Sequence, residues 1–126
     1  MQTDEVRLAV PATPEFLRLA RVTASGLASR LGFTYDEVED LRLAIDELCF
    51  VLIGSRGRDG TVDLRYTVVP GALQVEGVGT FRDDDTDPML ASFSKQILAA
   101  LVDEYGVHRD KDGHSCFRLL KRRGAT

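Results

Sequence analysis

The side chains of this chain that could do chemistry are few, and their spacing forms no complete catalytic set. Gly77 and Gly79 could admit a phosphate, but such a pair is more typical of a bulge or a turn. The acidic run 83–87 carries four aspartates, which would repel phosphates rather than cradle them. His108 and His114 flank the last predicted hairpin without an evident third ligand, so we expect no metal site.

The two cysteines and the net charge restrict where the protein works. Cys49 and Cys116 lie among apolar residues, which favours reduced, buried thiols over a disulfide or a metal pair. The net charge of −4 argues against nonspecific binding to DNA or to an anionic membrane. No apolar run approaches the roughly 20 residues that span a bilayer, and the polar start is unlike a secretory signal. We therefore expect a cytoplasmic protein without direct nucleic-acid or membrane partners.

The stretch 35–53 has the clearest helical pattern in the chain. Thr34 and Glu37 have the spacing of a capping box, and Gly54 stands where a helix stop is expected. Apolar residues recur at steps of three and four, which gives one buried face. That face consists of Val38, Leu41, Ile45, Leu48 and Leu52.

Two further helices are predicted. The first follows Thr13 as N-cap with Pro14 at its first position, and Gly32 ends it. Its buried stripe should consist of Phe16, Ala20, Ala24, Leu27 and Leu31. The last helix is expected within 90–104, where helical spacing returns.

Five strands complete the prediction. Alternating apolar residues place them at 6–10, 61–69, 72–78, 105–109 and 114–121. The stretches 81–88 and 121–123 should be a solvated loop and a solvated tail. This order predicts an α+β fold, a two-layer sandwich of three helices on a mostly antiparallel sheet of about five strands. The length of 126 residues suits a single domain over 1–126.

A family resemblance extends this interpretation over nearly the whole chain. Asp46-Glu47-Leu48-Cys49 is similar to the start of a Glu-Ala-Cys-x-Asn motif, and Ala20-Arg21-Val22-Thr23 resembles the first helix of a sporulation anti-sigma factor. The chain thus resembles anti-sigma factors of the RsbW type, in the GHKL superfamily with histidine kinases and gyrase. The runs 40–47 and 92–94 most resemble the mycobacterial anti-sigma-F proteins.

The resemblance implies a nucleotide site that has lost key residues. Glu47 corresponds to the general base that polarises a serine hydroxyl in kinase members, and Gly77 and Gly79 to glycines of an Asp-x-Gly-x-Gly motif. The magnesium-binding asparagine of the family is replaced by Val51, which offers no oxygen ligand. The adenine-binding aspartate is replaced by Val75.

The acidic run 83–87 also stands where the family has a glycine-rich lid. With three ATP features missing, we expect no cofactor, neither ATP nor magnesium, and a vestigial Glu47 without kinase activity. Glu47 would then be a charge on the helix surface or part of a residual ion pair.

The resemblance also implies protein partners. These are an alternative sigma factor of the sigma-F or sigma-B type, used in stress or sporulation, and a STAS-domain anti-anti-sigma factor that releases it. The expected contacts are Arg18, Arg21 and Ser25, since Arg21 matches an arginine that contacts both partners in the sporulation relative. A solvated arginine, or a pair between Arg18 and Glu15, is an equally good explanation.

Other associations remain open on the sequence. A homodimer is implied, through the unpaired edge strand 6–10, and the acidic run 83–87 could meet a basic sigma surface. One alternative function is an active serine kinase that phosphorylates its STAS antagonist. Another is a protein-interaction module for a partner other than a sigma factor.

Overall fold

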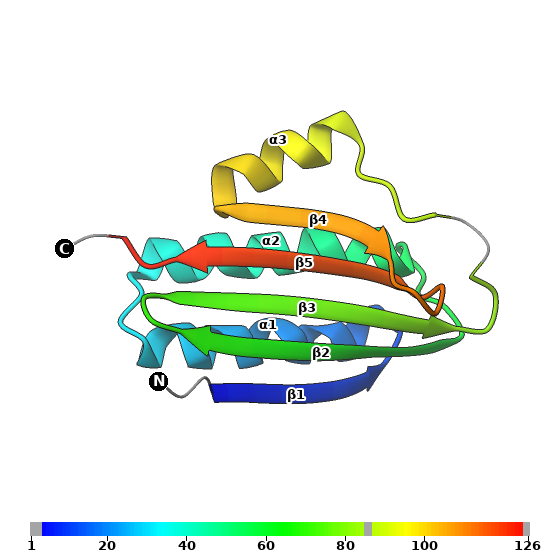
Figure 1. Cartoon of the computed structure of the whole chain (residues 1–126), viewed down its shortest axis with the longest axis horizontal. Coiled ribbons are helices and arrows are strands. Elements are labelled where there is room, and N and C mark those ends of the chain that lie inside the picture. The colour runs from blue at the N-terminus through cyan, green and yellow to red at the C-terminus, as the bar shows by residue number, and fades with distance from the viewer. Residues whose placement is uncertain (1–3, 85–86, 125–126) are drawn as a thin grey trace.

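The computed structural model describes residues 4–84 and 87–124, and its element order confirms the predicted one. The elements in Figure 1 are β1 (Asp4–Pro11), α1 (Pro14–Arg30), α2 (Tyr35–Ile53), β2 (Gly60–Val69), β3 (Ala72–Phe81), α3 (Ser92–Leu101), β4 (Glu104–Arg109) and β5 (Ser115–Arg122). Among these residues no helix is long and apolar enough to cross a bilayer.

The strands form one sheet in the order β1-β2-β3-β5-β4, and every neighbouring pair is antiparallel. Glycines with positive φ make the two hairpin turns, Gly71 between β2 and β3 and Gly113 between β4 and β5. Helices α1 and α2 lie across one face of the sheet, and α3 lies beside β4 (Figure 1). The predicted α+β two-layer sandwich is therefore confirmed.

Helix α2 has the predicted ends and the predicted buried face. Thr34 Oγ1 accepts from Glu37 N at 3.1 Å, and Thr34 N donates to Glu37 Oε1 at 2.7 Å. The hydrogen bonds that the Glu37 carboxylate accepts from Thr34 N and Gly124 N lower its pKa. Gly54 ends the helix at a φ of 73°, as a residue without a β-carbon readily does.

Helix α1 differs from its prediction in its cap and its buried face. The Thr13 side chain does not cap the helix, and its Oγ1 is buried without a hydrogen-bond partner among residues 4–84 and 87–124. The buried stripe is Leu17, Ala20, Ala24 and Ala28, whereas Phe16 is 43% exposed. Three small residues allow a close approach to the sheet, where the Tyr66 hydroxyl donates to Ala20 O at 2.9 Å. Burial raises the pKa of that hydroxyl.

Three other boundaries and contacts correct the prediction. Strand β3 continues past residue 78 to Phe81, and α3 occupies 92–101 rather than 90–104. The predicted solvated tail is wrong, because its basic residues bond back to the body of the fold. Lys121 Nζ donates to Leu101 O at 2.7 Å, and Arg123 Nη1 donates to Leu31 O at 2.8 Å.

Candidate functional site

The carboxylate of Glu47 is already bound to a serine hydroxyl of its own chain. Helix α2 presents Glu47 half-buried toward α3, where Ser94 Oγ donates to Glu47 Oε1 at 2.6 Å. A carboxylate within hydrogen-bond reach of a hydroxyl has the geometry of a general base. Val51 lies one turn further along the same face of α2 and is half-buried. Because its side chain is a hydrocarbon, it adds no oxygen ligand for a metal ion beside Glu47.

Gly77 and Gly79 lie under aromatic rings on the face of β3 that looks toward the helices. A β-carbon at Gly77 would overlap the ring of Phe117, its cross-strand partner on β5. A β-carbon at Gly79 would overlap the ring of Phe81. The pairing register runs through both glycines without a bulge, so a bulge or turn does not explain them. They leave room for two rings to cover the strand.

The acidic run 83–87 is not a freely solvated loop, because Asp84 is tied into the fold. Its side chain is 10% exposed and accepts hydrogen bonds from Ser115 N at 3.2 Å and Ser115 Oγ at 2.8 Å. Arg109 Nη2 lies 3.3 Å and Arg58 Nη2 3.8 Å from Asp84 Oδ1. Burial acts to raise the pKa of Asp84, but the Ser115 hydrogen bonds and the two guanidinium charges lower it overall.

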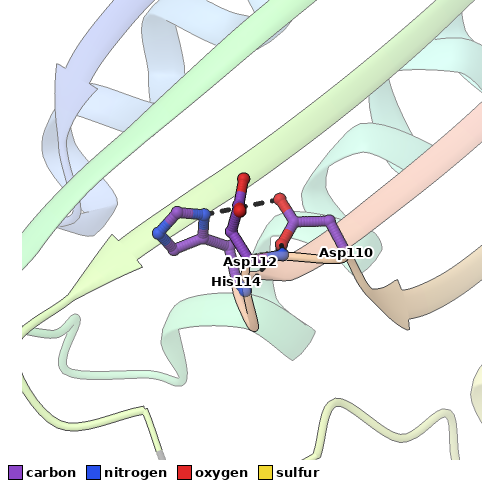
Figure 2. A group of neighbouring side chains, drawn as sticks. All are labelled: Asp110, Asp112 and His114. Atoms are coloured by element: carbon purple, nitrogen blue, oxygen red, sulfur yellow. Dashed lines mark hydrogen bonds and ion pairs between the residues drawn. The ribbon is translucent and has the colours of Figure 1, made fainter.

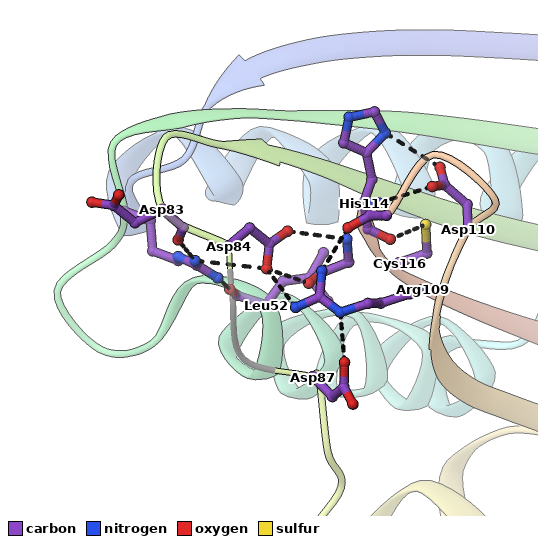
Figure 3. Close-up of polar contacts among 11 residues, drawn as sticks. Leu52, Asp83, Asp84, Asp87, Arg109, Asp110, His114 and Cys116 are labelled. Carbon is purple, nitrogen blue, oxygen red and sulfur yellow. Dashed lines mark hydrogen bonds and ion pairs between the residues drawn. The ribbon is translucent and has the colours of Figure 1, made fainter.

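The two arginines extend this network along the end of the sheet. Arg109 Nε also contacts Asp87 Oδ1 at 2.6 Å, and Figure 3 shows Asp84 and Asp87 both directed at Arg109. Arg58 donates to the backbone oxygens of Leu52 and Asp83. Of the predicted acidic run, residues 85 and 86 lie outside the described residues.

Arg58 also connects this network to the covered glycines. Its guanidinium carbon lies 4.1 Å from the centre of the Phe81 ring, a cation–π distance. The ring that covers Gly79 is therefore held in place by the same arginine that contacts Asp84.

Two of the three predicted partner-binding residues meet at a cavity between α1 and α2. The cavity has a volume of about 340 Å³, and both Arg18 and Arg21 line it. Arg21 Nη1 lies 3.3 Å from Asp46 Oδ2 on α2. Arg18 is exposed, and within residues 4–84 and 87–124 it makes no ion pair, with Glu15 or with any other residue. Ser25 Oγ donates to Arg21 O at 2.8 Å, so its hydroxyl turns back on its own helix.

Asp46 is a member of this cavity that the sequence reasoning did not single out. Burial raises its pKa, while the charges of Arg21 and Arg42 act in the opposite direction. Apolar residues of α2 adjoin it, with Phe50 at the rim and Ile53 below. The sequence shows an aspartate at position 46 of the predicted helix. It does not show that this side of the helix meets α1, because that depends on how the two helices pack.

A separate cluster at the β4–β5 turn consists of Asp110, Asp112 and His114 (Figure 2). The potential metal-ligand atoms of these three side chains lie within 4.8 Å of one another. The sequence reasoning considered only the two histidines and missed these aspartates at steps of two residues. Asp110 Oδ1 accepts from Asp112 N at 2.9 Å and from His114 N at 2.8 Å, so this carboxylate shapes the turn. His108 is exposed on β4 and is not part of the group.

The cysteines are buried and free, as predicted. Burial raises the pKa of the Cys49 thiol to about 12 and that of the Cys116 thiol to about 11. Neither thiol is therefore a good nucleophile at neutral pH.

Comparisons with known proteins identify the family. The chain is 40% identical over 75 residues to the serine-protein kinase RsbW of Bacillus subtilis, a match that covers 57% of this chain and 47% of that protein. The match to RsbW of Listeria monocytogenes is 37% over 75 residues, 57% of this chain and 48% of that protein. With RsbW of Bacillus licheniformis the identity is 33% over 111 residues, which cover 82% of this chain and 69% of that protein. The chain belongs to the RsbW family.

These matches differ in extent. The chain spans about half the length of the Bacillus subtilis and Listeria relatives. No family model matches it. The antiparallel sheet with three helices is consistent with the GHKL-like sandwich that the sequence predicted.

In this RsbW-family chain the predicted site residues lie in different surroundings. Glu47 bonds to α3 through Ser94, and Gly77 and Gly79 lie under rings. Arg18 and Arg21 lie apart from these residues, in the cavity between α1 and α2 that Asp46 also lines. The Ser94 contact joins residues 47 positions apart, so spacing along the chain could not reveal it.

Proposed function

We propose that this chain is an anti-sigma factor. It binds and sequesters an alternative sigma factor of the sigma-F or sigma-B type, and a STAS-domain anti-anti-sigma factor releases it by competing for an overlapping face. The observation that carries the proposal is the cavity between α1 and α2, where Arg18 and Arg21 stand together beside apolar side chains. Arginine next to apolar surface is a frequent composition of an interface hot spot, and membership of the RsbW family supports this use of it.

We propose further that binding does not require nucleotide. Val51 and Val75 offer no oxygen where the family resemblance expects a magnesium ligand and an adenine acceptor, and Val75 is fully buried in the core. The rings of Phe81 and Phe117 cover the two glycines. Switching would then depend on the state of the antagonist rather than on a kinase reaction of this chain.

The alternative function, a serine kinase acting on its STAS antagonist, has a specific observation in its favour. Relatives are named serine-protein kinases, and Glu47 lies at hydrogen-bond distance from a serine hydroxyl. This alternative requires that magnesium-ATP bind the native state and raise its melting temperature by mass action. We expect no shift at millimolar magnesium-ATP, measured by differential scanning fluorimetry with magnesium alone as the control.

The remaining associations follow from the same proposal. The sigma factor would be a stress or sporulation type, with the mycobacterial anti-sigma-F proteins as the branch that the motifs favour, and the complex would form in the cytoplasm. Strand β1 has β2 on one side and lies at one end of the sheet order, which leaves an edge for the proposed homodimer. Sedimentation equilibrium of the purified chain tests this dimer separately from sigma binding.

The test of the proposed function is a binding titration with purified alternative sigma factors from the same organism. Arg21→Glu should weaken binding of the target at least tenfold, because it reverses a charge in the cavity. Arg30→Glu is the matched control, since Arg30 is exposed in the last turn of the same helix. Binding that survives Arg21→Glu unchanged, with an intact circular dichroism spectrum, contradicts the assigned surface. A chain that binds no sigma factor contradicts the function and favours a different protein partner.

A further inference from the structure

The cavity between α1 and α2 combines an apolar floor with an exposed aromatic rim. Leu17, Cys49 and Ile53 line it and are each less than 10% exposed, whereas Phe50 is 55% exposed. A volume of about 340 Å³ is near the lower limit of small-molecule pockets and suits one or two protein side chains. An exposed ring beside a floor of this kind is an anchor point for an apolar side chain.

The charges of the cavity are unbalanced. Arg18 and Arg21 bring two positive charges, and Asp46 brings one negative charge. The imbalance stands out because the whole chain has a net charge of −4. Arg18 has no ion-pair partner in the part of the chain that the structure describes. The lining of the cavity therefore carries a net charge of +1, and a partner segment with an acidic side chain beside an apolar one is complementary to it.

The contact between Arg21 and Asp46 is a poor one for a guanidinium. A single Nη1–Oδ2 contact at 3.3 Å joins them, whereas an arginine and a carboxylate can form two parallel hydrogen bonds at shorter distance. The Asp46 side chain is 47% exposed, so water screens its attraction to Arg21. A carboxylate from a partner that approaches Arg21 end-on has better geometry available than Asp46 has.

We propose that this cavity receives an acidic-apolar segment of the sigma factor, and that Asp46 is an internal competitor that holds Arg21 until the segment arrives. The inference rests on the proposed function for the identity of the partner. In the complex, the incoming carboxylate bonds to Arg18 and Arg21, and the neighbouring apolar side chain packs on Phe50. Asp46 then turns to solvent, and its negative charge lowers the affinity.

The test is the affinity of the purified sigma factor for three variants of the full chain. Asp46→Asn removes the competing charge with little change of shape, and we expect it to tighten binding about three- to fivefold, the upper part of the range for a partly exposed ion pair. Asp36→Asn, an exposed position in the first turn of the same helix, makes the same change in net charge and should leave the affinity within twofold. Phe50→Ala should weaken binding at least tenfold.

The affinities of the three variants test the role of Asp46 and the cavity separately from the proposed anti-sigma function. Tighter binding by Asp46→Asn alone, with weaker binding by Phe50→Ala, supports the proposal. Equal effects of Asp46→Asn and Asp36→Asn would show that the change in net charge alone explains the tighter binding, which would overturn the proposal. An unchanged or weakened affinity of Asp46→Asn would also overturn the proposal. Either of these results leaves the proposed function standing, because the wild-type chain still binds. Absence of sigma binding by the wild-type chain would overturn both the proposed function and the proposal for the cavity. Binding of a STAS protein without binding of a sigma factor would likewise overturn both.

Discussion

Replacing Asp84 by asparagine tests whether the acidic run 83–87 is a structural tie. The Asp84 side chain is 10% exposed and accepts two hydrogen bonds from Ser115. Asparagine keeps one acceptor oxygen, so it can accept only one of the two hydrogen bonds from Ser115. Its amide N–H₂ group would then face the other Ser115 donor, with which it cannot form a hydrogen bond. Loss of a hydrogen bond to a charged group costs about 1.5–3 kcal/mol.

The arginines moderate the loss. Arg58 and Arg109 would lose a shared negative charge, but their side chains are 26% and 23% exposed, so water compensates part of the loss. Removing one partner of a fully buried pair costs about 3–5 kcal/mol, and here the total should stay below that range. We expect Asp84→Asn to lower the free energy of unfolding by about 2–3 kcal/mol, which lowers the melting temperature by roughly 6–12 °C for a domain of this size.

The assay is urea unfolding followed by circular dichroism at a series of pH values. Because the pKa of Asp84 is lowered in the folded state, its charge stabilises the fold fully above the ordinary aspartate value of about 3.9. That stabilisation is lost as the pH falls through the folded-state value. The difference between wild type and Asp84→Asn should therefore be largest at pH 7 and shrink toward pH 2.

The matched control is Asp83→Asn, an exposed neighbour whose carboxylate makes no contact within the described residues. It should change the free energy of unfolding by less than about 0.5 kcal/mol. An effect of Asp84→Asn as small as that of this control at pH 7 would contradict a structural role for the Asp84 carboxylate. A difference between wild type and Asp84→Asn that does not diminish in acid would contradict it as well.

Three further predictions follow from other contacts. Gly77→Ala should lower the free energy of unfolding by about 1–3 kcal/mol in urea titrations, because its β-carbon would overlap the Phe117 ring; an unchanged midpoint would show that the strand is not covered as described. Thr34→Ala should lower it by about 0.5–2 kcal/mol by removing one half of the capping box, with a corresponding fall in the melting temperature; no fall would mean that the cap is not needed. Cys49 should resist iodoacetamide at pH 8 in the native protein and react after urea unfolding, because burial raises its pKa to about 12; rapid native labelling by mass spectrometry would contradict this.

Features that depend on neighbours in the chain were predictable from the sequence. The cap and the glycine stop of helix α2 are local signals, and they predict its span from Tyr35 to Ile53. In α1, Phe16 and Leu17 are adjacent apolar residues, and periodicity alone does not decide which of them faces the sheet. The approach of Tyr66 to Ala20 decides it.

Features that depend on distant partners were not predictable. Asp84 is bound by residues 25 and 31 positions away, so a run of aspartates gave no sign that one of them is held in the fold. The cover over Gly77 comes from its cross-strand partner Phe117, which only the sheet register identifies. The contact between Arg21 and Asp46 likewise depends on how α1 packs against α2. The candidate site was therefore named in part, but its internal contacts came from the tertiary structure.

The most direct test of the central claim is affinity capture of the chain from a lysate of its own organism, with and without magnesium-ATP, followed by identification of the bound proteins. We expect one alternative sigma factor to be recovered in equal amount under both conditions. Recovery only with magnesium-ATP would contradict nucleotide-independent binding and the roles given to Val51 and Val75. Recovery of no sigma factor under either condition would contradict the anti-sigma function itself.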